Sequence, residues 1–136
     1  ETEKKKALSE VAIESIGITN GLLSNDSIRS KIANLEMNEK IFELTIQRAL
    51  DEHKAGNNSG AVSSFFKYYG TELAMQKEEL RLEVNGFNST EWTSEESNNG
   101  VYARYFCRSK GHSIEGGTHE VQLNIIAKRV LGLPSK

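Results

Sequence analysis

The chain has 136 residues, of which 37% are hydrophobic and 26% charged, and its seventeen basic and nineteen acidic side chains leave a net charge of −2. This near-neutral balance argues against a nucleic-acid-binding or membrane-surface protein, and the single cysteine, Cys107, excludes an internal disulfide framework and any multi-cysteine metal site. No apolar run approaches the roughly 20 residues needed to span a bilayer, and no signal-peptide core follows the N-terminus, so we expect a cytoplasmic protein without a membrane span.

The first half of the chain predicts two helices. Apolar residues at a spacing of three to four favour a helix over Lys5–Ile18, ended by Asn20-Gly21. A second, longer amphipathic helix is predicted over Ser27–Lys54, because apolar residues recur there with a period of about 3.6. Its predicted buried stripe consists of Ile28, Ile32, Leu35, Phe42, Ile46 and Leu50, and we expect Met37, Ile41 and Leu44 to widen the same stripe.

Glycines and polar clusters divide the second half of the chain into further elements. After a turn over Gly56–Gly60, the pattern predicts a third helix from Val62 to near Asn85-Gly86 and a polar loop, Phe87–Gly100, around Trp92. The remaining predicted elements are a short helix, Val101–Lys110, an irregular connection, Gly111–Gly117, and a final helix, Thr118–Leu131, closed by Gly132 and Pro134.

Together these elements predict one helical domain over residues 1–136. The only proline is Pro134, so almost nothing in the first 133 positions forbids helix. Each long helix carries a single apolar stripe, and such helices most simply pack antiparallel. We therefore predict an all-α fold, an antiparallel domain resembling a four-helix bundle.

The segment with the most chemical information is the glycine pair Gly116-Gly117, followed by Thr118 at the start of the final helix. Such an opening exposes unpaired N–H groups at the positive end of the helix dipole, and it could hold a phosphate or pyrophosphate. The alternative is a threonine N-cap with a flexible lead-in, which is the more frequent explanation of a lone glycine pair.

A longer pattern around this pair resembles a known family. The runs Gly116-Gly117-Thr118, Glu120-Val121-Gln122, Asn124–Ala127 and Val130–Pro134 occur in the order and spacing found at the C-terminal end of bacterial acyl-CoA dehydrogenases. The resemblance is strongest over residues 108–134. Upstream it is weaker: Phe66–Glu72 and the helix from Ile28 resemble the preceding segments of that family.

The resemblance implies that this chain is the later part of the C-terminal helical bundle of a larger flavoenzyme. A first residue that is Glu1 and not methionine fits an excised or processed piece. The whole enzyme would use FAD to convert an acyl-CoA to the trans-2-enoyl-CoA and would pass electrons to an electron-transfer flavoprotein. This chain, inactive alone, would contribute packing within a homo- or hetero-oligomer and part of the FAD site.

The resemblance also implies site residues, carried over position by position. FAD contacts are expected at Gly117, Thr118, His119 and Glu120, and at a second stretch that contains Glu83 and Gly86. In the second stretch Glu83 stands where the family has glutamine, and an acid beside a pyrophosphate is electrostatically unfavourable.

The position of the catalytic base also departs from the family pattern. Many members carry a glutamate directly before the Gly-Thr pair, where this chain has Gly116. The nearest carboxylate belongs to Glu115, one residue earlier and therefore displaced by about 3.8 Å along the chain. Glu115 is our hypothesis for the base, and the alternative is an ordinary exposed loop glutamate.

These departures leave a second interpretation open. In that interpretation the chain is a helical module that retains the bundle fold but no catalytic function, and it acts through protein–protein contacts. The altered Glu83 stretch and the glycine at position 116 favour that interpretation modestly.

Overall fold

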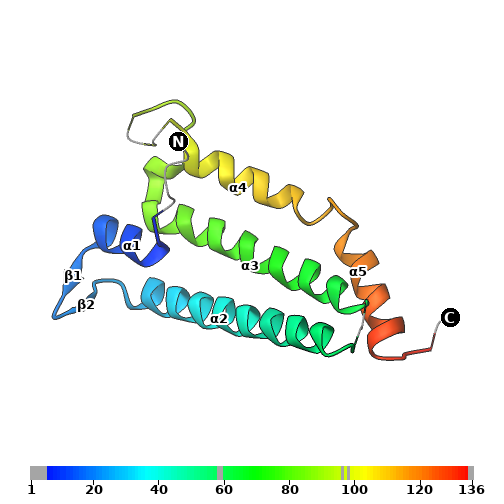
Figure 1. The fold of residues 1–136 in the computed structure, drawn as a ribbon. Coiled ribbons are helices and arrows are strands. Elements are labelled where there is room, and N and C mark those ends of the chain that lie inside the picture. Colours follow the sequence, from blue (N-terminus) through cyan, green and yellow to red (C-terminus); the bar gives the residue numbers. More distant parts are fainter. Residues whose placement is uncertain (1–5, 58–59, 96, 98, 135–136) are drawn as a thin grey trace.

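The computed structural model describes residues 6–57, 60–95, 97 and 99–134, and in that part of the chain helices dominate (Figure 1). The prediction of an all-α fold is confirmed. The elements in chain order are α1 (Leu8–Ile16), β1 (Ile18–Thr19), β2 (Leu22–Leu23), α2 (Asp26–Lys54), α3 (Val62–Asn85), the 3₁₀ turn η1 (Gly86–Thr90), α4 (Val101–Gly111), α5 (His119–Ile125) and the π-helical segment η2 (Ile126–Val130).

Three antiparallel helices, α2, α3 and α4, lie side by side with α3 in the middle (Figure 1). Helix α3 contacts α1, α2, α4 and α5, so it is the element around which the others are arranged. Helix α1 packs beside the C-terminal half of α3, and α5 lies near its N-terminal half (Figure 1). The two ends of α3 therefore carry different neighbours, and this placement decides the geometry of the candidate site.

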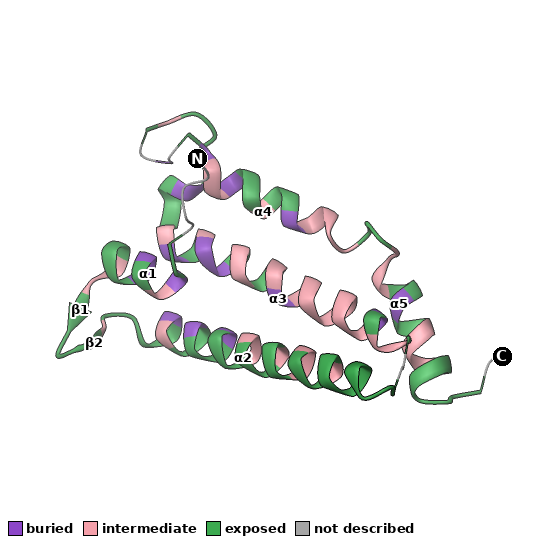
Figure 2. Ribbon diagram, in the orientation of Figure 1, coloured by how far each residue is buried: buried purple, intermediate pink, exposed green. Residues whose placement is uncertain are grey.

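The apolar core lies where α1, the beginning of α2 and the end of α3 meet. Figure 2 shows the buried residues gathered at that end of the layer, whereas the C-terminal half of α2 is largely exposed. The core residues are Leu8, Val11, Ala12, Ile28, Ile32, Leu35, Leu73, Leu80 and Val84. At the other end, Phe42 of α2 packs against Phe66 and Tyr69 of α3, with ring centroids 5.9 and 5.7 Å apart, and extends the contact between the two helices.

Helix α2 begins at Asp26, one residue before the predicted Ser27, and it ends at Lys54 as predicted. The Asn25 side chain accepts a hydrogen bond from the Ile28 N–H at 3.0 Å, which satisfies one of the free donors of the first turn. His53 and Lys54 lie in the last turn, where positive charge is favourable.

The prediction that Met37, Ile41 and Leu44 widen the buried stripe of α2 is wrong. These side chains are 58%, 57% and 59% exposed, and Leu50 is also exposed. A helix turns by about 100° per residue, so Leu44, nine residues after the buried Leu35, points in the opposite direction. Helix α2 therefore has a second, outward apolar face.

Two local features differ from the predicted helices. The first helix ends at Ile16 and not at Ile18, and a short antiparallel hairpin follows in which Ile18 pairs with Leu23. Both Asn20 (φ 53°) and Gly21 (φ 76°) are left-handed, as a tight two-residue hairpin turn requires. The final helix becomes π-helical after Ile125, with the Leu131 N–H bonded to the Ile126 carbonyl. Its last helical residue is Val130, one before the predicted Leu131, and the left-handed Gly132 (φ 64°) follows.

Candidate functional site

The segment between α4 and α5 folds into a compact loop that its own main chain holds closed. The Glu115 N–H donates to the Gly111 carbonyl at 3.1 Å, and the His119 N–H donates to the Ser113 carbonyl at 3.2 Å. Lys67 of α3 also contributes, because its Nζ donates to the His112 carbonyl at 2.7 Å. The loop is therefore anchored at both of its ends and to α3, and it is not the flexible lead-in of the alternative interpretation.

The two glycines of this loop have left-handed backbones that the buried side chain of Gln122 supports. Gly116 has φ 66° and Gly117 has φ 99°. Gln122, only 7% exposed, donates from Nε2 to the Gly116 carbonyl at 3.1 Å. A Cβ on Gly117 would lie 2.6 Å from the same Nε2, so a side chain there would displace this anchor. The loop thus offers a bare backbone in a fixed conformation.

Thr118 is the N-cap of α5, and its hydroxyl is already engaged. Its Oγ1 accepts the Val121 N–H at 3.4 Å. The pKa of Glu120 is lowered, first by a hydrogen bond from its own backbone N–H and then by one from the Thr118 hydroxyl. Because Glu120 therefore stays ionised, an anionic ligand approaching the start of α5 would meet a carboxylate there.

His119 points toward α3 and is largely buried. Its Nδ1 lies 3.1 Å from Glu72 Oε1, and its ring meets the Tyr68 ring edge-on with centroids 4.9 Å apart. The buried Nε2 has no hydrogen-bond partner among the described residues. In this conformation His119 docks α5 on α3, and a direct ligand contact from its ring would require the ring to move.

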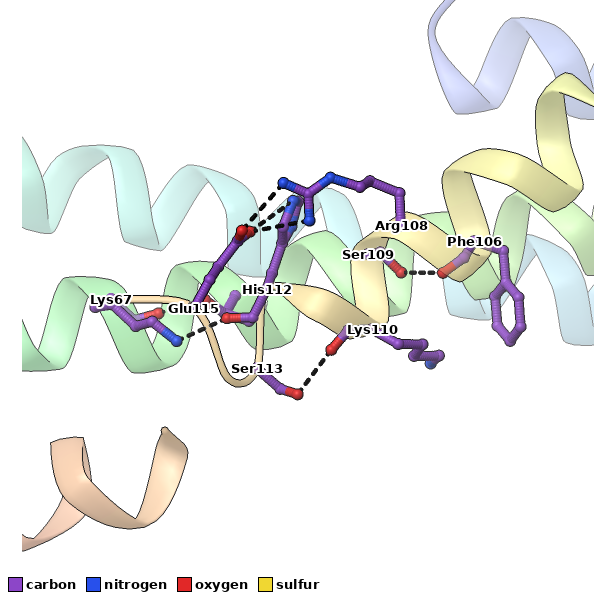
Figure 3. A network of polar contacts seen from close by, with 9 residues as sticks. Lys67, Phe106, Arg108, Ser109, Lys110, His112, Ser113 and Glu115 are labelled. Atoms are coloured by element: carbon purple, nitrogen blue, oxygen red, sulfur yellow. Dashed lines mark hydrogen bonds and ion pairs between the residues drawn. The ribbon is translucent and has the colours of Figure 1, made fainter. Parts of the chain in front are cut away.

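Glu115 lies on the solvent side of the loop between two basic side chains (Figure 3). Arg108 makes two contacts with its carboxylate, at 3.2 and 3.0 Å, and His112 Nε2 lies 3.4 Å away. The hydrogen bond from Arg108 lowers the pKa of Glu115, and the positive charge of Arg108 adds to this effect. A general base needs a raised pKa and a site from which water is excluded. The pKa of Glu115 is instead lowered, and its carboxylate is exposed to solvent.

The second predicted stretch lies at the C-terminal end of α3. Glu83 forms an ion pair with Lys31 of α2, with Nζ and Oε1 2.5 Å apart. Gly86 ends α3 with a left-handed backbone, and the side chain of Phe87 is 94% exposed. Beside Phe87 lies a shallow, mostly apolar hollow of about 360 Å³, which Leu82, Glu83, Gly86 and Thr90 also line. Lys31 offsets the negative charge that makes Glu83 unfavourable beside a pyrophosphate.

The structure does not bring the two predicted stretches together. The Gly117 loop and α5 dock near Glu72, whereas Gly86 ends α3 fourteen residues later. At a rise of 1.5 Å per residue, the two places are about 20 Å apart along α3. One compact ligand therefore cannot touch both within a single copy of the chain.

Sequence reasoning missed four residues that shape these stretches: Lys31, Lys67, Glu72 and Gln122. Three of them act on partners more than forty positions away in the chain, and no local signal marks such pairs. Gln122 stands in the Glu-Val-Gln run, where a polar residue one turn after the N-cap could have indicated a contact with the preceding loop. Among the described residues there is no group of three metal-ligating side chains and no helix long and apolar enough to cross a membrane.

Comparisons with known protein families and solved structures identify proteins that are similar to this chain. The family model described as "Acyl-CoA dehydrogenase, C-terminal domain" matches residues 16–131. Among solved structures, the ChsE4–ChsE5 complex from Mycobacterium tuberculosis contains a chain with 26% sequence identity and a TM-score of 0.75; the match covers 95% of this chain and 35% of that one. The chain therefore spans about a third of the length of that relative. No curated protein sequence matches it.

Proposed function

The chain belongs to the acyl-CoA dehydrogenase family, and from this premise we propose that it is the C-terminal helical part of a cytoplasmic, FAD-dependent acyl-CoA dehydrogenase. It forms one helical domain over residues 1–136 and supplies oligomer contacts and part of the FAD site. The complete enzyme would oxidise an acyl-CoA to the trans-2-enoyl-CoA and deliver electrons to an electron-transfer flavoprotein.

The observation that carries this proposal is the fixed backbone of Gly116-Gly117, inside the segment that the family model matches. A flat or charged ligand group can approach the main chain at the exposed Gly116, where a Cβ would meet only Lys67, at 3.9 Å, while Gln122 fills the corresponding space at Gly117. Gln122 and Lys67 hold the loop in place before a ligand arrives, which lowers the conformational entropy lost on binding. Such preorganisation is typical of a binding loop.

The residues present fit part of a flavin dinucleotide. Near α5, the main chain of Gly117 and the Thr118 hydroxyl are the groups that would hold it, once Thr118 is released from Glu120. His119 would act through its contact with Glu72, which fixes the position of α5. When bound, FAD supplies the two-electron oxidation chemistry, and this part of the chain supplies binding and orientation.

The Glu83 stretch would hold a different region of the cofactor or a second cofactor. Lys31 would face a phosphate group there once it is released from its ion pair with Glu83, while Gly86 leaves the end of α3 open for close approach. Since this stretch is about 20 Å from the Gly117 loop, we propose that each serves a separate FAD in an assembly of more than one chain.

The catalytic base belongs elsewhere in the complete enzyme. The carboxylate of Glu115 is solvent-exposed, paired with Arg108 and lowered in pKa, which makes it a weak base for removing a proton from an acyl-CoA. We therefore assign it the role of holding the loop to α4, and the hypothesis that it is the base becomes the less favoured one.

A second candidate function is a helical interaction module without chemistry, and one observation favours it. The outward face of α2 exposes Met37, Ile41 and Leu44, and exposed apolar patches commonly mark protein–protein contacts. This function requires no bound flavin.

Flavin absorption separates the two functions. The complete enzyme, purified from cells, is expected to show the visible bands of bound FAD, and the 136-residue chain alone is expected to lose added FAD on gel filtration. A complete protein that lacks these bands, and does not acquire them when FAD is added, would exclude the flavoenzyme and leave the interaction module.

A further inference from the structure

The chain contains three steps at which an asparagine is followed by a glycine: Asn20-Gly21, Asn85-Gly86 and Asn99-Gly100. Such a step can react with itself, because a glycine has no side chain to keep its main-chain nitrogen away from the asparagine side chain. The reaction needs a nitrogen that is free of hydrogen bonds, a side-chain amide that can turn toward it, and a main chain that can rotate. The structure meets these conditions at one of the three steps.

Asn20 and Gly21 form the exposed turn between β1 and β2 (Figure 1). Among the described residues, neither the Gly21 N–H nor the Asn20 side chain has a hydrogen-bond partner. A Cβ on Gly21 would meet nothing within 4 Å, so the space around the turn is open. The hairpin has only two residues in each strand, and so short a pair of strands is easily opened. The nitrogen is therefore free and the main chain can rotate.

The step at the end of α3 has both reacting groups engaged. The Gly86 N–H is bonded to the carbonyls of Glu83 and Leu82. The side-chain amide of Asn85 donates to the Arg81 carbonyl at 2.8 Å. An attack of the Gly86 nitrogen on Asn85 would break these bonds and unwind the last turn of the helix, so this step is protected.

The step before α4 is protected in a different way. The Gly100 N–H donates to the main-chain carbonyl of Ser97 at 3.2 Å and to the Ser97 hydroxyl at 3.0 Å. Gly100 is also buried, and the main chain of Trp92 lies so close that a Cβ on Gly100 would clash with it. The nitrogen is therefore bonded, and the main chain has no room to rotate toward the Asn99 side chain.

We propose that Asn20 is a site of spontaneous deamidation, distinguished from Asn85 and Asn99 by the free main-chain nitrogen that follows it. The Gly21 nitrogen loses its proton and bonds to Cγ of Asn20, the bond from Cγ to the side-chain nitrogen breaks, and ammonia leaves. Water then opens the resulting succinimide ring at either of its two carbonyls, which gives aspartate or isoaspartate. One water is consumed and one ammonia is released, and the reaction requires no oxidant, cofactor or bound flavin.

The products change the shape and the charge of the hairpin. Isoaspartate adds one atom to the main chain at a two-residue turn, so the pairing of Ile18 with Leu23 no longer fits. The bond from the Ser24 N–H to the Gly17 carbonyl, 3.0 Å long, closes the base of the same hairpin. Either product also adds a carboxylate to a mostly apolar groove of about 260 Å³ that the hairpin lines together with α1 and α2. Deamidation is thus a slow, one-way change to this surface.

The first test ages the 136-residue chain in mildly alkaline buffer and measures both products at each step by peptide mapping and mass spectrometry. Asn20 is expected to react at least about tenfold faster than Asn85 and Asn99, because each of these must first lose hydrogen bonds. Asn85 and Asn99 share one tryptic peptide, so fragment spectra assign their products. The control is the same chain in urea, where the three rates are expected to agree within a few-fold. Equal rates in the folded chain would overturn the proposal.

The second test removes the protection at one of the slow steps. Ser97→Ala deletes the hydroxyl that holds the Gly100 N–H and is expected to raise the rate at Asn99 several-fold, with the rate at Asn20 unchanged. The matched control is Ser89→Ala, a second buried serine, whose hydroxyl bonds only to carbonyls; it is expected to leave Asn99 unchanged. Circular dichroism verifies that both variants keep their helices. An unchanged rate at Asn99 in Ser97→Ala would show that hydrogen bonding does not select the site.

The third test separates the added charge from the altered main chain. Asn20→Asp carries the carboxylate with a normal main chain, whereas the isoaspartate form is isolated from aged protein by ion exchange. Hydrogen exchange of the Ser24 N–H is expected to be at least about tenfold faster in the isoaspartate form, because the hairpin opens. In Asn20→Asp it is expected to stay close to that of the unmodified chain. Equal exchange in the isoaspartate form and the unmodified chain would refute the proposed change of the hairpin.

Discussion

The side-chain amide of Gln122 donates a hydrogen bond to the main-chain carbonyl of Gly116, 3.1 Å away, and this contact ties the glycine loop to helix α5. The two residues are six positions apart, and the buried Gln122 side chain fills the space where a Cβ of Gly117 would lie. The conformation of the candidate binding loop and the packing of α5 are therefore one structural feature, and a change to either affects both.

Replacing Gly117 with alanine is the most direct test of this coupling. The left-handed backbone costs an alanine about 1–2 kcal/mol, and displacing the Gln122 amide costs roughly 1 kcal/mol more. Gly117→Ala is expected to lower the free energy of unfolding by about 2–3 kcal/mol, measured by urea denaturation. Gly116→Ala is the matched control, because its Cβ meets only Lys67 at 3.9 Å and should cost only the backbone strain. Equal losses for the two variants would contradict the role of Gln122.

Thr118 has two separable roles, as an N-cap and as a proposed flavin contact. Thr118→Val removes the acceptor for the Val121 N–H and is expected to cost about 1 kcal/mol of stability with most of the helix retained. In the complete enzyme it should also weaken FAD retention on gel filtration. Thr118→Ser keeps the hydroxyl and should preserve both properties. Normal FAD retention in the valine variant would argue against the carried-over contact.

Glu83 is expected to limit flavin binding through its charge. Glu83→Gln restores the residue found at this place in the family and frees Lys31 from its ion pair. In the complete enzyme the variant should retain FAD more tightly, as measured by equilibrium dialysis, because a phosphate would then face Lys31 without a competing carboxylate. Stability should change by less than about 1 kcal/mol, since the pair is half-exposed. Weaker retention in Glu83→Gln would show that the carboxylate itself contributes to binding.

The pairing of Glu115 with Arg108 predicts a pH dependence of defined sign. Because the folded-state pKa of Glu115 is lowered, the contribution of the pair to stability is present above the unfolded-state pKa and is lost as the pH falls through the lowered value. An NMR titration of the Glu115 carboxyl carbon should show this lowered pKa, and Arg108→Gln should return it toward its ordinary value. A titration that Arg108→Gln leaves unchanged would refute the pairing.

Turnover gives an independent measurement on the same residue. Glu115→Gln in the complete enzyme is expected to leave dehydrogenation within a few-fold of the unmodified protein, because a general base typically contributes at least a hundredfold. Loss of dehydrogenation with normal flavin content would restore Glu115 as the catalytic base.

Much of the fold could be predicted because its signals are local. The recurrence of Ile28, Ile32 and Leu35 identifies α2, and the Asn25 cap fixes its first turn. The two-residue strands of the hairpin were missed because they are too short to show alternation. The exposure of Met37 and Leu44 depends on which side of α2 the rest of the chain covers, and apolar character alone does not show that a side chain is covered.

The sequence predicts which segments form the candidate site, but it does not predict how these segments are arranged in space. Gly116, Gly117 and Thr118 identify the loop from their order in the chain, but the fixed conformation depends on Lys67, which lies 45 positions before its partner His112. The pairing of Glu83 with Lys31, 52 positions apart, likewise follows only from the packing of α2 against α3.

The sequence by itself therefore determined which segments are helical, where the main helices start and stop, and which family motif the last helix carries. These properties depend on residues within a few positions of each other, whose backbone preferences and spacing act locally. Only the tertiary structure decided that Glu115 forms an ion pair with Arg108, that the Gly117 loop and Gly86 lie toward opposite ends of α3, and that one apolar face of α2 is exposed. Those facts arise because helix packing brings distant residues together and decides which side of an edge helix such as α2 stays exposed, and no local pattern specifies either outcome.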